Sequence, residues 1–253
     1  MAKKTTIQEE FLLPSRGLLY GKPFDPTVKL RSMTVTEEMK RLAPSINPYK
    51  SMSEIIEDCL LTKLPISVYD LCLGDYTFLL HKLRIVTYGP EYNVQFACPK
   101  CGNVEKIKFN LDELKVNLIK DEKELDKLRT VTLPSNGSVV KLRFQTPRDL
   151  DNIQLKAKDM KENFPEMEGD PTLLLTLQSL IESVNGEPLS PITGLEELKK
   201  LPMMDTNVIA QTATKLNEKV GIDTAITLHC PNCGNDVNSQ FRFTSEFFGP
   251  SID

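Results

Sequence analysis

Two short cysteine motifs constrain the fold of this chain more than any other feature. They read CPKCGN at residues 98–103 and CPNCGN at residues 230–235, and they hold four of the six cysteines. Two cysteines that flank two residues of a tight turn point both sulfurs to the same side, and two such pairs complete the four-cysteine set of a structural zinc site. The pairs are unusually distant, since Cys101 and Cys230 are 129 positions apart, where ordinary ribbons use a couple of dozen residues. A shared metal would therefore tie two distant halves of the chain together.

Other uses of the four thiols have to be weighed against zinc. A redox pair would place its CxxC at the start of a helix, whereas both motifs here lie between strand-like runs. Buried reduced thiols are a further alternative. A catalytic zinc keeps an open coordination position, and no histidine or carboxylate joins the set. We therefore predict one structural Zn²⁺ per chain, with four ligands: Cys98, Cys101, Cys230 and Cys233.

Composition limits the class of protein and its partners. The chain has 253 residues, of which 40% are hydrophobic and 26% charged, as in soluble globular proteins. A net charge of −4 leaves no basic surplus for phosphates, so we expect no nucleic-acid partner. No apolar run approaches the roughly 20 residues of a membrane span, and residues 1–6 lack the apolar core of a signal peptide. We expect a protein made in a cytosol, without a membrane partner.

Residues 1–30 are predicted to form an extended N-terminal arm. Prolines and glycines form turns there between apolar side chains, which are Phe11, Leu12, Leu18, Leu19, Tyr20 and Phe24. These side chains need a surface, and that surface is either the protein's own body or a partner protein.

Residues 31–123 are predicted to form a first unit of short helices and a knuckle hairpin. Thr34 and Glu37 form a capping box before a first helix. A second helix is expected over residues 53–61, and a third over residues 76–86 with Asp75 as its cap. Apolar residues then alternate over 92–96 and 107–111, which predicts a strand on each side of the first knuckle.

The second half of the chain repeats the first, and this predicts an internal duplication. LPSNG at 133–137 matches LPSRG at 13–17, and Thr146 to Asp149 follows LR as Thr34 to Glu37 does. Asp205 is expected to cap a helix as Asp75 does, and each knuckle follows a glycine by nine residues. We expect an α+β fold of two duplicated units, 31–123 and 124–253, joined through a helical stretch at 112–130. A pseudo-twofold arrangement would bring the knuckles into one shared, zinc-ribbon-like site of four cysteines.

The remaining residues suggest no enzyme. No P-loop, GxGxxG, HExxH or Ser/His/Asp grouping is present. His81 is expected to be a surface or half-buried residue, and His229 to lie on the face of its strand opposite the knuckle. Cys59 and Cys72 are expected to be small buried hydrophobes. The C-terminal Phe247-Phe248 pair is expected to be either an exposed docking tag or packed on the second unit.

The order of motifs in residues 11–111 resembles the T4-type bacteriophage baseplate hub protein family. It runs LPSRGLLY, MTVTEE, LCLGDYTFLLHKLRIVTYGPEY and CPKCG. The resemblance implies a late, structural component of the tail baseplate hub, made in the host bacterial cytoplasm and present in the virion. It implies the same four cysteines as metal ligands, no catalytic residue, and hub or tail proteins as partners, reached through the N-terminal arm and the C-terminal tail. The second unit departs from the pattern, with Val220-Gly221-Ile222 where the first has Tyr88-Gly89-Pro90.

Two other functions remain open at this point. One is a baseplate hub assembly factor that leaves before the virion matures, which shares every sequence feature with a component. The other is a zinc-ribbon adaptor of the transcription type. The acidic balance of the chain disfavours the adaptor.

Overall fold

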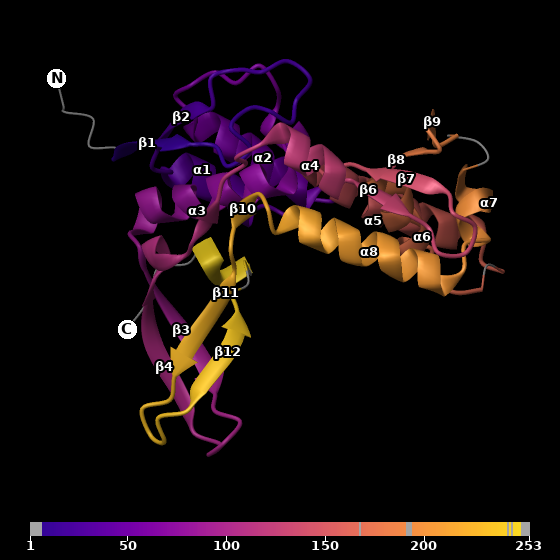
Figure 1. The fold of residues 1–253 in the computed structure, drawn as a ribbon. Helices are drawn as coiled ribbons and strands as arrows, with labels where there is room; N and C mark the ends of the chain where they lie inside the picture. Colours follow the sequence, from indigo (N-terminus) through magenta and orange to yellow (C-terminus); the bar gives the residue numbers. More distant parts are fainter. Residues whose placement is uncertain (1–6, 167, 191–193, 242, 244, 249–253) are drawn as a thin grey trace.

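The first half of the chain folds into a hairpin, three helices and a second, longer hairpin (Figure 1). The computed structural model describes residues 7–166, 168–190, 194–241, 243 and 245–248. The elements of this half are β1 (Gln8–Leu12), β2 (Thr27–Arg31), α1 (Val35–Leu42), α2 (Pro48–Cys59), η1 (Val68–Asp70), α3 (Leu73–Tyr88), β3 (Glu91–Ala97), β4 (Val104–Asn110) and η2 (Leu111–Glu113). The helices predicted after Thr34 and over residues 53–61 and 76–86 are therefore present, as are the knuckle strands. The stretch at 112–130 was predicted to be helical but is interrupted by a short strand at Val116–Asn117.

The second half adds a four-stranded sheet to a similar set of elements. These are β5 (Val116–Asn117), α4 (Glu122–Leu128), β6 (Thr130–Thr132), β7 (Val139–Leu142), α5 (Pro147–Asn163), α6 (Thr172–Leu180), β8 (Ile181–Val184), β9 (Glu187–Pro188), α7 (Gly194–Lys199), α8 (Met203–Asn217), β10 (Gly221–Ile222), β11 (Ala225–His229), β12 (Asp236–Gln240) and η3 (Ser245–Phe248). Strands β6, β7, β8 and β9 form the antiparallel sheet, in that order, and the other strands pair in twos. The result is a mixed α+β fold. No helix in the described part of the chain is long and apolar enough to cross a membrane.

The N-terminal segment packs on the protein's own body. Strands β1 and β2 pair antiparallel, with Gln8 opposite Arg31. Because side chains alternate along a strand, Val28 and Leu30 of β2 both point inward, and they are completely buried together with Leu13. The apolar side chains of the predicted arm mostly use the chain's own core as well. Five of them, Phe11, Leu18, Leu19, Tyr20 and Phe24, are partly buried and pack against it, whereas Leu12 is 41% exposed. The unit boundaries at residues 30 and 123 stay a prediction.

The C-terminal phenylalanines are also part of the core, so they are not an exposed tag. Phe247 is completely buried and Phe248 nearly so. Phe247 contacts the rings of Tyr92 and Phe241, each with centroids 5.7 Å away. The buried Arg84 of α3 donates from Nε to the Phe247 carbonyl oxygen over 2.7 Å. The end of the second half is therefore locked onto the third helix of the first.

A serine–aspartate contact to a buried aspartate occurs once in each half. In the first half Asp75 accepts from the Ser15 backbone N–H over 2.8 Å and from the Ser15 hydroxyl. In the second half Asp205 accepts from the Ser135 backbone N–H over 3.1 Å and from the Ser135 hydroxyl. The two carboxylates were expected to cap helices, but each lies in the first turn of its helix and holds the preceding LPS turn instead. The same long-range contact at matching positions supports the duplication.

The capping boxes are duplicated as well. The Thr34 N–H and hydroxyl donate to Glu37, and Arg31 pairs with the same carboxylate at 2.8 Å. Arg31 lowers the pKa of Glu37 to about 2. The second half repeats the arrangement with Thr146, Asp149 and Arg143, whose ion pair with Asp149 is also 2.8 Å. Each box fixes the start of a helix after a buried strand.

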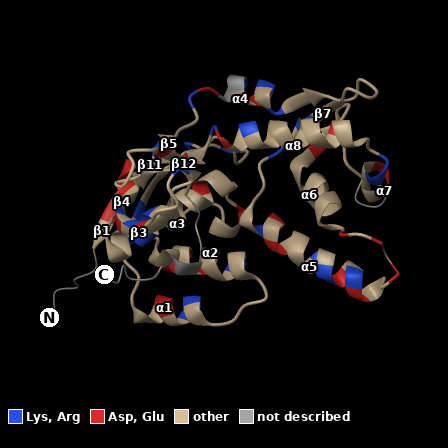
Figure 2. Ribbon diagram, turned by 90° about the horizontal axis from the view of Figure 1, so that it is seen from below, with Lys and Arg blue, Asp and Glu red and all other residues tan. Residues whose placement is uncertain are grey.

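The two halves meet through α5, which lies against α2 and η1 (Figure 2). The carboxylate of the buried Asp151 accepts from the Tyr69 hydroxyl at 2.9 Å, and also from two backbone N–H groups at the start of α2, where Asn47 provides no side-chain cap. Arg148 pairs with Asp70 at 2.6 Å and covers the Tyr69 ring. A helix of the second half thus caps a helix of the first.

The burial of the N-terminal hairpin is testable at single side chains. Leu30→Ala should lower the free energy of unfolding by about 2–5 kcal/mol, because it leaves a cavity in the core. Leu12→Ala, on the same hairpin but 41% exposed, should cost less than about 1 kcal/mol. Urea unfolding of both variants measures the difference. Equal, small losses would show that the hairpin does not belong to the core.

Candidate metal centre

Two β-hairpins carry the cysteine motifs to one end of the molecule. Hairpin β3–β4 and hairpin β11–β12 extend from the helical body, and their turns lie together at the far end (Figure 1). Their apolar residues alternate with exposed ones and join a single hydrophobic core, and they include Val94, Phe96, Ile107, Ile226, Leu228 and Val237. Because apolar residues alternate with polar ones along these strands, each hairpin has an apolar face. Packing of these faces positions the knuckles.

Both knuckles have the same backbone geometry. The Cys98 N–H donates to the Asn103 carbonyl oxygen at 2.8 Å, and the Gly102 N–H donates to the Cys98 carbonyl oxygen at 2.9 Å. In the second knuckle residues 230, 234 and 235 make the equivalent two bonds, each at 2.9 Å. Gly102 and Gly234 have φ angles of 70° and 66°, in the left-handed region that favours glycine. The CPxCGN sequence therefore encodes this turn directly.

The four sulfurs lie at the spacing of a tetrahedral metal site. Cys98 Sγ is 3.7 Å from Cys233 Sγ, and Cys101 Sγ is 3.7 Å from Cys230 Sγ. All four lie within 4.8 Å of one another. Tetrahedral zinc with Zn–S bonds of about 2.3 Å separates its sulfurs by roughly 3.8 Å, whereas a disulfide needs about 2.05 Å. The arrangement fits one metal ion shared by both halves, and all four cysteines are free thiols.

Neighbouring amides favour the thiolate form in the first knuckle. The backbone N–H of Asn103 and the side chain of Asn232 lower the pKa of Cys101 to about 6. Asn232 belongs to the second knuckle, so a side chain of one half affects the pKa of a cysteine in the other half. The backbone N–H of Cys101 lowers the pKa of Cys98. For Cys233 a backbone N–H also lowers the pKa, but desolvation and the three nearby thiols outweigh it and raise the pKa to about 12. Four thiols this close favour binding a cation.

Neither histidine joins the cysteines. His229 is exposed and its Nδ1 lies 2.5 Å from an oxygen of Asp236, on the outer face of its hairpin as expected. His81 is completely buried, so the expectation of a surface or half-buried residue was wrong. Its Nε2 lies 3.0 Å from the Leu111 carbonyl oxygen, and burial lowers its pKa to about 4. Its position follows from η2 folding back over α3, a contact that helical periodicity does not encode.

The two remaining cysteines are buried as predicted. Cys59, the last residue of α2, lies in the core, and desolvation raises its pKa to about 12. Cys72 accepts a hydrogen bond from the Tyr20 hydroxyl over 3.3 Å. Neither sulfur lies in the four-cysteine cluster.

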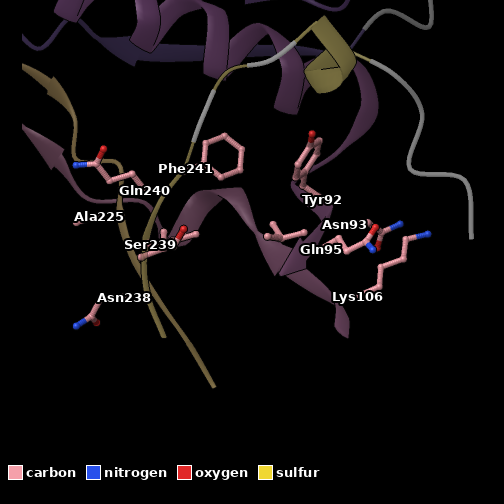
Figure 3. Close-up of a pocket in the computed structure, with 11 residues that line it drawn as sticks. Tyr92, Asn93, Gln95, Lys106, Ala225, Asn238, Ser239, Gln240 and Phe241 are labelled. Atoms are coloured by element: carbon pink, nitrogen blue, oxygen red, sulfur yellow. The ribbon is translucent and has the colours of Figure 1, made fainter. Parts of the chain in front are cut away.

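A groove of about 910 Å³ opens between the two hairpins (Figure 3). Tyr92 and Phe241 lie at the end nearest the helical body, and amide side chains of β3 and β12 line the rest, among them Asn93, Gln95, Asn238 and Gln240. The lining contains Lys106 but no carboxylate, histidine or cysteine. It also contains the Ser239 hydroxyl, so the groove offers hydrogen-bond donors and acceptors from both hairpins.

Comparison with known proteins identifies the family. Residues 5–249 match the model of the family described as T4 bacteriophage base plate protein. Neither a curated protein nor a solved structure gives a significant match. The match includes both halves and both knuckles, and so extends well beyond residues 11–111, where the sequence motifs resemble the family. The chain therefore belongs to the T4 bacteriophage base plate protein family.

Proposed function

We propose that this chain is a non-enzymatic, structural component of the baseplate hub of a contractile phage tail, held in shape by one Zn²⁺. The observation that carries the proposal is the meeting of Cys98, Cys101, Cys230 and Cys233 in a chain of the base plate family. Four thiolates leave no open coordination position, which is typical of a structural zinc site and not of a catalytic one.

The proposed role of the metal is to fasten the two halves together. The hairpins share an apolar face, but each has only two strands, and an isolated two-stranded hairpin is marginally stable in water. A structural zinc site contributes about 10–16 kcal/mol of apparent binding free energy. An ion bound by two ligands from each half would make the far ends of the hairpins one rigid unit.

We expect one zinc ion per chain. Protein purified without added metal should give a zinc-to-protein ratio near one by inductively coupled plasma mass spectrometry, because four thiols complete one tetrahedral site. Iron also binds tetrahedral thiolate sets, and the same measurement detects it. A ratio near two, or folded protein with no metal, would refute a single shared site.

Loss of one ligand should loosen both hairpins. In Cys230→Ala, amide hydrogen exchange should rise over residues 91–110 as well as over residues 225–240, because the ion connects them. His229→Ala is the matched control, since His229 is the exposed neighbour of Cys230 and lies outside the cluster. Faster exchange in the second hairpin alone would mean that the knuckles are independent.

The proposed partners are other hub and tail proteins, with no nucleic acid and no membrane. The N-terminal hairpin uses its inward side chains for the core, so a contact through it would rely on the exposed Ile7 and Leu12. The proposed contact through the C-terminal tail depended on Phe247 and Phe248, which are buried in the core, and residues 249–253 lie outside the described part of the chain. The net charge of −4 disfavours binding to phosphates. The groove between the hairpins, with its amide lining, supports a binding role over a catalytic one.

The location in the virion separates a component from an assembly factor. The chain would be made in the host bacterial cytoplasm and retained in the tail. Quantitative mass spectrometry of purified phage particles should find it at a fixed ratio to the other baseplate proteins. Its absence from mature particles, combined with its presence in assembly intermediates, would identify it as an assembly factor instead.

A further inference from the structure

Helix α1 presents its apolar side to solvent. Its only buried residue is a charged one, Glu37, which pairs with Arg31. Apolar side chains at helical spacing form a stripe on the outer side, here called the α1 stripe, and their exposed fractions are 76% for Val35, 68% for Met39 and 67% for Leu42. Ile46, in the loop that follows the helix, is 80% exposed. Single exposed apolar residues are ordinary, but a contiguous group of this kind marks an interaction site.

The charges of α1 are already paired within the chain. Glu37 pairs with Arg31 at 2.8 Å, Glu38 with Arg41 at 2.6 Å, and Lys40 with Asp58 at 2.5 Å. These pairs include every charged residue of the helix. A ligand at this face would therefore be held by apolar contact, and its binding would depend little on salt.

The duplicated helix α5 shows what this face does in the other half. Aligned on the capping threonines, Val35 and Met39 correspond to Pro147 and Asp151 of α5. Both residues of α5 are buried, and Asp151 accepts hydrogen bonds from the start of α2. The first turns of this face of the repeated helix are thus an interface within the chain, whereas Gln154, the counterpart of Leu42, is exposed. On α1 the same face is apolar, and it lies at the edge of the helical layer, outside α2 (Figure 2).

We infer that the α1 stripe binds an apolar groove on another baseplate protein. This inference rests on the proposed function of the chain as a baseplate component. A second copy fits the stripe poorly, because two stripes packed on each other would bury only three side chains from each copy. Three side chains cover less than the roughly 800 Å² per partner of a stable interface. A groove that surrounds a helix buries more area for each side chain.

The test uses baseplate intermediates purified from cells infected with phage that lack this chain. Recombinant wild-type protein is added, and its co-sedimentation with the particles is measured at about 0.1 M and about 0.5 M NaCl. The double variant Met39→Glu/Leu42→Glu is compared with Met203→Glu/Met204→Glu, which introduces the same charges at exposed methionines of α8. Thermal unfolding and analytical ultracentrifugation of each free protein accompany the binding assay.

We expect wild type and the α8 variant to bind equally at both salt concentrations. The α1 variant should bind more than about tenfold more weakly, with an unchanged melting temperature. Equal binding of all three proteins would refute the inference and leave the proposed function standing. A wild-type protein that does not bind the particles would instead refute the proposed function. A lower melting temperature of the α1 variant, or a wild-type dimer that this variant abolishes, would show that the stripe is covered by the chain itself or by a second copy, and would overturn the inference.

Discussion

The contact between two cysteine pairs from opposite halves is the constraint on which this structure depends. Sulfurs 3.7 Å apart across the halves require both hairpins to have the right length, tilt and separation. The hairpins meet this requirement because their alternating apolar residues pack on each other, and because the Phe241–Phe247 cluster closes the space at the opposite end. The four-cysteine cluster and the aromatic cluster therefore lie at the two ends of the same pair of hairpins.

The serine–aspartate contacts and the capping boxes occur once in each half, whereas the residues at the interface between the halves differ. Ser15 with Asp75, and Ser135 with Asp205, hold equivalent turns on equivalent helices. At the interface the copies differ, because Asp151 caps α2 while its counterpart Met39 faces solvent. Duplication supplies two similar surfaces, and one of them is used to join the halves. The other is then available for a different protein.

The sequence was sufficient for features with local signatures. The knuckle turns, the capping boxes at Thr34 and Thr146, and the duplication follow from residue types at fixed spacing, and the structure contains both turns and both caps. Contacts between distant residues were not predictable in this way. The partner of Asp75 is 60 positions away, His81 is buried by a segment 30 positions later, and the apolar residues of the N-terminal hairpin fit a partner as well as a core. In each case the local pattern is compatible with two environments, and tertiary packing decides between them.

X-ray absorption spectroscopy at the zinc edge tests the central claim most directly, because it reports the number and type of ligands around the ion. The account predicts four sulfur neighbours at about 2.3 Å in the wild-type protein, and three sulfurs with one lighter ligand after substitution of any one cysteine of either knuckle. A wild-type spectrum with two sulfurs and two nitrogen or oxygen ligands would contradict it, since each knuckle would then bind metal without the other half of the chain.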